Sequence, residues 1–252
     1  MMPYIITIFG AIPTFPLCVA LGILFMFWVL HLILKKSVEP KKEESFIFPK
    51  IVICLTVAFL FAALFDAFFK FLKYGQFKIK GITFYGGLFG AILSLYIQLK
   101  IAKKREFSQY SISEWFDILT LSVLSFHFWG RIGCFLGGCC YGKITTSIFG
   151  VIFPDNPLNN IVHDGVKRYP TQLFEAVALA IIFFIVLFRK KKFQTYLLFY
   201  ALVRFLLEFF RGDDRGTFTY LSPAQIISII ILLILLLYNV KQLLKKANCR
   251  ER

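Results

Sequence analysis

Residues 13–34 read PTFPLCVALGILFMFWVLHLIL, a run that contains no Asp, Glu, Lys or Arg. A membrane-spanning helix needs roughly 20 mainly apolar residues, so this run is long enough to cross a bilayer. It has neither a basic leader nor a small-residue cleavage site, which predicts a retained helix and not a cleaved signal peptide. Similar apolar runs follow at 50–72, 82–100, 113–135, 171–188, 194–211 and 221–240.

The composition of the whole chain agrees with these runs. Of its 252 residues, 58% are hydrophobic and 17% are charged, whereas about 25% of an ordinary soluble domain is charged. Seven spans of about 20 residues each occupy more than half of the chain, which leaves no room for a large water-soluble domain. We therefore predict an all-α polytopic membrane protein with about seven transmembrane helices, forming one integral membrane domain over residues 1–252.

Basic residues gather in alternate connections between the apolar runs. The chain has 29 Lys and Arg against 14 Asp and Glu, a formal charge of +15, which in a soluble protein would suggest a nucleic-acid partner. Here the cations lie at the ends of apolar runs, where the positive-inside rule makes them cytoplasmic, so no nucleic-acid partner is predicted. The connections richest in Lys and Arg are 35–50, expected to be a charged loop, and 100–105, 189–192 and 241–252.

This distribution also predicts the orientation of the chain. The N-terminus is expected outside and the C-terminus in the cytoplasm. The one long connection, 136–170, then becomes an outer-face loop in which polar and glycine residues gather.

Ionisable residues occur inside the sixth apolar run. Such residues are costly in a bilayer and mark a functional site or a buried pair. Arg204, Glu208 and Arg211 in VRFLLEFFR fall on one helical face at about 100° per residue. A structural ion-pair ladder is one interpretation, since Arg204 and Glu208 are four residues apart. Two Arg for one Glu instead predict an anionic ligand.

A glycine-rich stretch, GRIGCFLGGCCYG at 130–142, ends the fourth run. Its glycines predict a break in the helix with exposed backbone N–H groups, which together with the Arg131 guanidinium suit a phosphate. Tight packing between helices through Gly133 and its neighbours is the alternative.

Two further runs begin with residues of interest. Tyr85, Gly86 and Gly87 open the third run, where a helix contact and a ligand role are both open. The fifth begins after RYP, and its Gln172 and Glu175 share one face. Glu175 near a helix start is also explained by the helix dipole. In the second run, Asp66 and Lys70 are spaced to pair with each other.

Three of the six cysteines, Cys134, Cys139 and Cys140, lie close together in the sequence. With His127 or His163 they could complete a metal site, but the C-x4-C-C spacing does not resemble a tetrahedral zinc motif. The sequence therefore predicts no metal site. A disulfide from Cys134 to Cys139 or Cys140 stays open on an oxidising outer face.

Taken in order, these motifs resemble the prolipoprotein diacylglyceryl transferase family over about residues 14–230. GRIGCFLGGCCYG is similar to its signature through Gly130, Arg131, Gly133, Phe135 and Gly142. RYPTQLFE, from Arg168 through Gln172 to Glu175, matches its Arg-x-Pro-(Ser/Thr)-Gln-Leu-(Tyr/Phe)-Glu element. VRFLLEFFR matches its Arg-Phe-x-x-Glu-x-x-Arg helix, and LSPAQIIS the start of its last span.

The resemblance implies an enzyme of lipoprotein biosynthesis in the bacterial inner membrane, with its active site facing the outer side. It implies transfer of the diacylglyceryl group from phosphatidylglycerol to the lipobox cysteine thiol in a prolipoprotein signal peptide, with release of glycerol phosphate. This is the first step of lipoprotein maturation, and it needs no cofactor. The partners are then membrane lipid and the precursor protein.

The resemblance also implies roles for single residues. Arg131 and Arg204 are expected to hold the lipid phosphate, with Arg168 and Arg211 at the outer rim, and Glu175 and Glu208 are expected to orient these guanidinium groups. The predicted catalytic residues are Arg131, Arg204, Tyr85 and Glu208. The predicted substrate-binding residues are Gly86, Gly87, Gly133, Gly142, Arg168, Gln172, Glu175 and Arg211.

The chain departs from the family pattern at several positions. Tyr85 stands where the family commonly has a His proposed to deprotonate the thiol, and a phenol with a pKa of about 10 is a weak base at neutral pH. Cys134 and Gly137 replace Asn, Cys139 replaces an acidic residue, and Phe15 stands for a Tyr. These departures leave two other hypotheses open: a diverged relative with another acceptor, and a non-catalytic lipid-binding protein.

Overall fold

A computed structural model describes residues 4–7, 10–75, 84–103, 108–155, 165–212 and 221–250. This part of the chain is mostly helical and forms two compact units. One unit comprises Met1–Leu30 with Asp117–Arg252, and the other comprises His31–Phe116.

Seven α-helices make up most of the described chain. They are α1 Thr14–Leu34, α2 Pro40–Tyr74, α3 Phe84–Lys103, α4 Ile112–Gly137, α5 Thr171–Leu187, α6 Lys192–Leu207 and α7 Pro223–Arg250. Among the described residues, α1, α2, α4, α6 with the turn after it, and α7 are long and apolar enough to cross a membrane, while α3 and α5 are apolar but shorter. Large apolar side chains such as Leu24 and Phe184 are 65% and 63% exposed, as expected of surfaces that face lipid. The prediction of a polytopic helical membrane protein is confirmed.

Helix ends differ from the prediction where charged residues follow or precede an apolar run. α2 already begins at Pro40, so most of the loop expected at 35–50 is helical, and α7 continues to Arg250. Lys and Glu are good helix formers, so the backbone stays helical beyond the hydrophobic part of each element.

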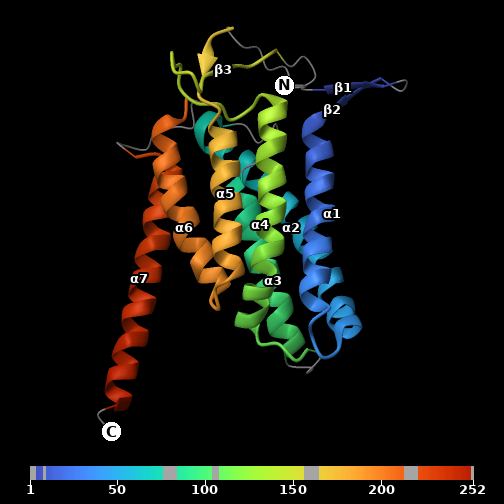
Figure 1. The fold of residues 1–252 in the computed structure, drawn as a ribbon, viewed down its shortest axis with the longest axis vertical. Helices are drawn as coiled ribbons and strands as arrows, with labels where there is room; N and C mark the ends of the chain where they lie inside the picture. Colours follow the sequence, from blue (N-terminus) through green and yellow to red (C-terminus); the bar gives the residue numbers. More distant parts are fainter. Residues whose placement is uncertain are drawn as a thin grey trace. The chain divides into compact units, whose positions relative to one another are not determined.

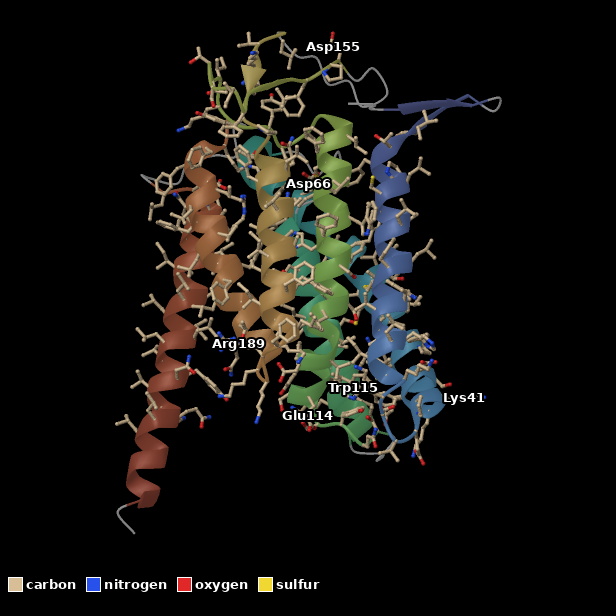
Figure 2. The ribbon with its side chains drawn as sticks, in the orientation of Figure 1. Lys41, Asp66, Glu114, Trp115, Asp155 and Arg189 are labelled. Atoms are coloured by element: carbon tan, nitrogen blue, oxygen red, sulfur yellow. The ribbon has the colours of Figure 1, made fainter. Side chains whose placement is uncertain are left out.

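The unit His31–Phe116 is built on α2 and α3. Gly90 of α3 lies so close to α2 that a Cβ atom there would be 2.7 Å from the Cβ of Phe61. The buried carboxylate of Glu43 accepts hydrogen bonds from the Ser108 hydroxyl and the Gln109 backbone N–H, at 2.8 and 3.1 Å. Lys41, Glu114 and Trp115 lie at one end of this unit, and Asp66 lies farther along α2 (Figure 2).

The predicted pair of Asp66 with Lys70 involves a side chain outside the described residues, because the Lys70 side chain is not among them.

In the other unit, α4, α5 and α6 run side by side (Figure 1), and α6 also packs along α7. α1 approaches α4 at Gly22, where an added Cβ would lie 3.1 Å from the Cβ of Trp129. This unit also contains two short antiparallel strand pairs: β1 Tyr4–Thr7 with β2 Gly10–Pro13, and β3 Val151–Ile152 with β4 Lys167–Arg168. The all-α prediction is therefore incomplete, because the described chain also contains two small two-stranded sheets.

Strand β3 and Asp155 lie at one end of this unit, beyond the end of α4, and Arg189 lies at the opposite end of α5 (Figure 2). The described part of the segment 136–170 that includes β3 and Asp155 thus lies at this end of the helices (Figure 1 and Figure 2). Part of it, including His163, lies outside the described residues.

Candidate active site

α6 ends one turn earlier than its sequence pattern predicts. The helix stops at Leu207, Glu208–Phe210 form the 3-10 turn η2, and Arg211 has extended backbone with φ −73° and ψ 143°. The prediction that Arg211 shares a helical stripe with Arg204 and Glu208 is therefore wrong, because the helix ends before it.

Arg211 instead joins the glycine-rich segment. Gly142 and Arg211 form an antiparallel bridge, and the Lys143 N–H donates to the Phe210 carbonyl at 2.8 Å. A Cβ atom on Gly142 would lie 2.7 Å from the Phe210 carbonyl oxygen and 2.7 Å from the Cβ of Tyr169. Only glycine fits where these segments cross. Packing therefore explains why the glycine-rich stretch ends in Gly142, and no contact between Gly142 and a ligand is needed.

α4 continues through most of the glycine-rich stretch. It ends at Gly137, so Arg131 lies on a helix, and the predicted break around Arg131 is wrong. A Cβ atom on Gly133 would lie 2.9 Å from the Cβ of Cys18 on α1. This close approach favours the helix-packing alternative for Gly133.

Glu175 of α5 is the centre of a buried polar cluster. Its side chain is 1% exposed, and its Oε1 atom lies 3.0 Å from Nη2 of Arg131 on α4. The same oxygen accepts a hydrogen bond of 2.9 Å from the Tyr200 hydroxyl on α6. His127 Nε2 lies 3.8 Å from it. One carboxylate oxygen of Glu175 thus contacts side chains from two other helices and lies against the Arg131 guanidinium.

Aromatic side chains close this cluster on one side. The His127 and Tyr200 rings meet edge to face with centroids 4.9 Å apart, and His127 Nδ1 lies 3.3 Å from the Tyr196 hydroxyl. The sequence suggests only a possible metal-ligand role for His127 and no role for Tyr196 or Tyr200. The i, i+4 spacing of Tyr196, Tyr200 and Arg204 on α6, and of His127 and Arg131 on α4, is the signal that could have found them.

Arg204 and Glu208 form the second ion pair. Arg204 Nη2 lies 2.7 Å from Glu208 Oε2, and both side chains are 7% exposed. This contact is not aligned as a hydrogen bond, and within the described chain Arg204 Nη1 is buried without a hydrogen-bond partner. A buried donor without an acceptor is costly, so this nitrogen marks a place where a ligand oxygen would be stabilised.

Arg131 pairs with Glu175, and Arg204 pairs with Glu208. Of the two Arg residues counted against Glu208 in the sequence, Arg204 is the one that pairs with it, and Arg211 lies beyond the end of the helix.

Arg168 and Arg211 both form backbone bridges with the segment after α4, to Ile144 and Gly142 respectively. Arg168 lies in β4 with its guanidinium carbon 4.8 Å from the centre of the Tyr141 ring.

Polar side chains at the start of α5 hold the turn after α4. The Gln172 amide donates to the Cys139 carbonyl, and the Thr171 hydroxyl donates to the Cys140 carbonyl at 2.8 Å. Gln172, predicted to bind substrate, therefore has a structural contact with this turn.

None of the described cysteines forms a disulfide, so neither of the disulfides left open by the sequence is present among them. The sulfur atoms of Cys134, Cys139 and Cys140 nevertheless lie within 4.8 Å of one another. Hydrogen bonds with Cys134 and Cys140, together with burial, raise the pKa of the Cys139 thiol.

Tyr85, Gly86 and Gly87 belong to the other unit, at the start of α3. The Tyr85 side chain lies outside the described residues. A Cβ atom on Gly87 would lie 3.4 Å from the Ala58 carbonyl and 3.5 Å from the Ala62 Cβ, both on α2. This contact favours a helix-packing role for Gly87.

The LSPAQIIS element forms the start of α7. The Ser222 N–H donates to the Gln225 side chain at 3.0 Å, and the Gln225 N–H donates to the Ser222 hydroxyl at 3.3 Å. This reciprocal pair is a capping box, which accounts for the Ser and Gln of the motif.

These features define a class of protein: a multi-pass helical membrane protein that has two buried Arg–Glu pairs and a glycine-rich turn at the end of α4. Residues 3–240 match the family described as prolipoprotein diacylglyceryl transferase. The chain belongs to this family.

Individual relatives agree with the family match. Phosphatidylglycerol–prolipoprotein diacylglyceryl transferase 2 of Clostridium perfringens is 35% identical over 181 residues, which cover 68% of this chain and 67% of that protein. The enzyme of Clostridium tetani is 32% identical over 174 residues, 66% of each chain. The enzyme of Wolbachia from Brugia malayi is 26% identical over 262 residues, covering 94% of this chain and 93% of that protein. The alignments with the two Clostridium enzymes thus span about two thirds of those proteins.

Proposed function

We propose that this chain transfers the diacylglyceryl group of phosphatidylglycerol to the lipobox cysteine thiol of a prolipoprotein and releases glycerol phosphate. The family match and the names of the relatives support this activity. The structural observation that carries it is the buried Arg204 guanidinium, whose Nη1 has no hydrogen-bond partner in the described chain. A phosphate oxygen is the acceptor that such a donor favours.

The reaction places clear demands on the site. A thiolate sulfur attacks a glycerol carbon while a phosphate leaves with the electron pair of the broken C–O bond. Cationic donors must therefore stand where negative charge grows on the phosphate. We assign this role to Arg204 and Arg131.

The carboxylates keep these guanidinium groups in place. Glu175 holds Arg131 at 3.0 Å and is itself held by Tyr200 at 2.9 Å, and Glu208 holds Arg204 at 2.7 Å. Arg168 and Arg211 add positive charge at the rim, and Gly142 lets the segment of Arg211 pass close to Tyr169.

The proposal includes an orientation in the bacterial inner membrane. Five long and two shorter apolar helices support seven spans, with the N-terminus outside and the C-terminus in the cytoplasm. Asp155 lies beyond the end of α4, and Arg189 lies at the opposite end of α5 (Figure 2), which agrees with an outer loop at 136–170 and a basic cytoplasmic connection at 189–192. The Arg–Glu pairs then serve substrates that arrive from the outer leaflet.

The test is transfer of radiolabelled glycerolipid from phosphatidylglycerol to a lipobox peptide by membranes that contain the full chain. Arg204→Lys keeps the charge beside Glu208 but loses the forked donor, and we expect transfer to fall by about 10²-fold or more. Lys191→Ala, which changes an exposed cation in the α5–α6 connection, is the matched control and keeps full transfer.

Equal transfer by wild type and Arg204→Lys would contradict the phosphate role. A wild-type chain that binds lipid yet releases no glycerol phosphate would contradict the transferase activity, and rescue of a strain depleted of its own transferase would support it.

A further inference from the structure

The turn that follows α4 brings three thiols together. Gly138 and Cys140 have φ of 76° and 65°, in the left-handed region that a residue with a side chain rarely adopts. The Cys139 N–H donates to the Cys134 carbonyl at 3.1 Å. Because of this reversal, the sulfur atoms of Cys134, Cys139 and Cys140 lie within 4.8 Å of one another.

The turn is held in this strained form by α5. Gln172 and Thr171 donate to the carbonyl groups of Cys139 and Cys140. A non-glycine residue keeps a positive φ only where its surroundings hold it, and such positions concentrate at functional sites. The three thiols are therefore preorganised by side chains of a second helix.

The distances suit one thiophilic metal ion. Zinc binds thiolates at about 2.3 Å, so sulfur ligands in tetrahedral geometry lie about 3.8 Å apart. A shift of about 1 Å or less would bring the three sulfur atoms to that spacing. Soft thiolate ligands favour Zn²⁺ over Mg²⁺ or Ca²⁺. The C-x4-C-C spacing looked unlike a zinc motif because sequence spacing does not reveal the left-handed turn.

Three protein ligands leave one position of a tetrahedral zinc ion open, which is typical of catalytic and not of structural zinc. Three thiolates and Zn²⁺ carry one net negative charge. Arg131, which pairs with Glu175 at 3.0 Å, lies one turn before Cys134 on α4 and places a guanidinium beside that charge. The three-thiol cluster thus adjoins the residue assigned to the lipid phosphate.

We propose that Cys134, Cys139 and Cys140 bind one Zn²⁺ ion and that its open fourth position takes the acceptor thiol. The second half rests on the proposed function. The entering thiol displaces a zinc-bound hydroxide, which leaves as water with the thiol proton. The zinc-bound sulfur then forms the C–S bond to the glycerol carbon as the C–O bond to the phosphate breaks, and glycerol phosphate leaves with that electron pair.

A zinc-bound acceptor thiol can lose its proton even though Tyr85 stands where the family commonly has a His. A phenol is a poor base for a thiol at neutral pH, whereas a metal ion deprotonates a coordinating thiol directly. The thiol proton is then removed within the unit that holds Arg131 and Arg204.

The first test measures metal, not activity. The full chain is purified in detergent under reducing conditions and its zinc content is determined by mass spectrometry. We expect one Zn²⁺ per wild-type chain, less than a tenth of that in Cys134→Ser and Cys139→Ser, and full content in the matched control Cys54→Ser. Wild type without zinc, or a chain 2 Da lighter because of a disulfide, would overturn the metal site.

Cobalt binding to the wild-type chain tests the metal site without any cysteine substitution, so misfolding of a variant does not affect the result. Wild type loaded with Co²⁺ is expected to show the sulfur-to-cobalt charge-transfer absorption of a three-thiolate site, and the absence of this band would contradict the proposal. A lipobox peptide should then alter the cobalt spectrum, while the same peptide with Ser in place of Cys should not.

Identical spectra with both peptides would overturn the open-position role and leave the metal site standing. Zinc-loaded wild type that fails to transfer lipid would contradict the proposed function, and with it the role of the open position, but not the metal site, so the failures are distinguishable.

Discussion

Glu175 places one buried oxygen atom between a guanidinium and a phenol from two neighbouring helices. Arg131 approaches it at 3.0 Å and Tyr200 at 2.9 Å. Because the carboxylate is 1% exposed, no water replaces either partner when it is changed. The position of Arg131 and the stability of the helix packing therefore depend on the same atom.

Glu175→Gln should destabilise the protein strongly. The amide can still accept the Tyr200 hydrogen bond, but the buried Arg131 charge loses its counterion, which costs about 3–5 kcal/mol. Thermal unfolding in detergent measures this loss. Glu39→Gln removes an exposed pair with Lys42 and should change stability by less than about 1 kcal/mol. Comparable effects of the two changes would contradict the central role of Glu175.

Tyr200→Phe tests the hydrogen bond to Glu175 without removing the ring. We expect a loss of about 1–3 kcal/mol, because a buried acceptor loses its donor, together with slower lipid transfer as Arg131 loses its fixed position. Tyr196→Phe is the matched control, since its hydroxyl meets His127 at 3.3 Å and does not donate to Glu175. If the control slowed transfer as much as Tyr200→Phe, the effect would belong to the aromatic pair and not to the Glu175 contact.

At the residue scale, the sequence identified the charged members of the site. Arg131, Arg204, Glu175 and Glu208 stood out because ionisable groups are rare inside apolar runs, and the structure brings them into two pairs. His127 and the two tyrosines did not stand out, since aromatic residues are common on every face of these helices. Only the packing of α4 and α6 against α5 brings His127 and Tyr200 to Glu175.

Among the elements, the centres of the helices were predictable and their ends were not. Hydropathy reports which residues suit lipid, so the seven apolar runs coincide with α1 to α7. It does not report where a backbone stops being helical. α6 therefore ends at Leu207, inside its apolar run, and α4 continues through Gly133 to Gly137 in a stretch expected to break.

The crossing of Gly142 with the end of η2 supplies the next prediction. In Gly142→Ala the new Cβ would lie 2.7 Å from the Phe210 carbonyl oxygen, and backbone cannot yield as a flexible side chain does. Overpacking of this kind costs about 1–3 kcal/mol, so we expect lower thermal stability and displacement of Arg211.

Gly130→Ala is the matched control for this change. No atom lies within 4 Å of an added Cβ there, and Ala favours a helix interior by about 1 kcal/mol over Gly, so stability should hold or rise. Unchanged stability in Gly142→Ala would show that the crossing is looser than its geometry indicates.

At the scale of the whole molecule, the orientation in the membrane remains a prediction from charge, and it can be tested at two labelled positions. Asp155 lies at the β3 end of its unit and Arg189 at the other end of α5 (Figure 2). The positive-inside rule places the Lys-rich connection beside Arg189 in the cytoplasm, so Asp155 should face outward.

In intact cells, a membrane-impermeant maleimide should label Asp155→Cys at once and label Arg189→Cys only after the inner membrane is permeabilised. The parent chain, whose described cysteines are buried or half-buried, provides the background. Labelling in the reverse order would put the Arg–Glu pairs and the three thiols at the cytoplasmic end, where a thiol acceptor delivered to the outer leaflet could not reach them.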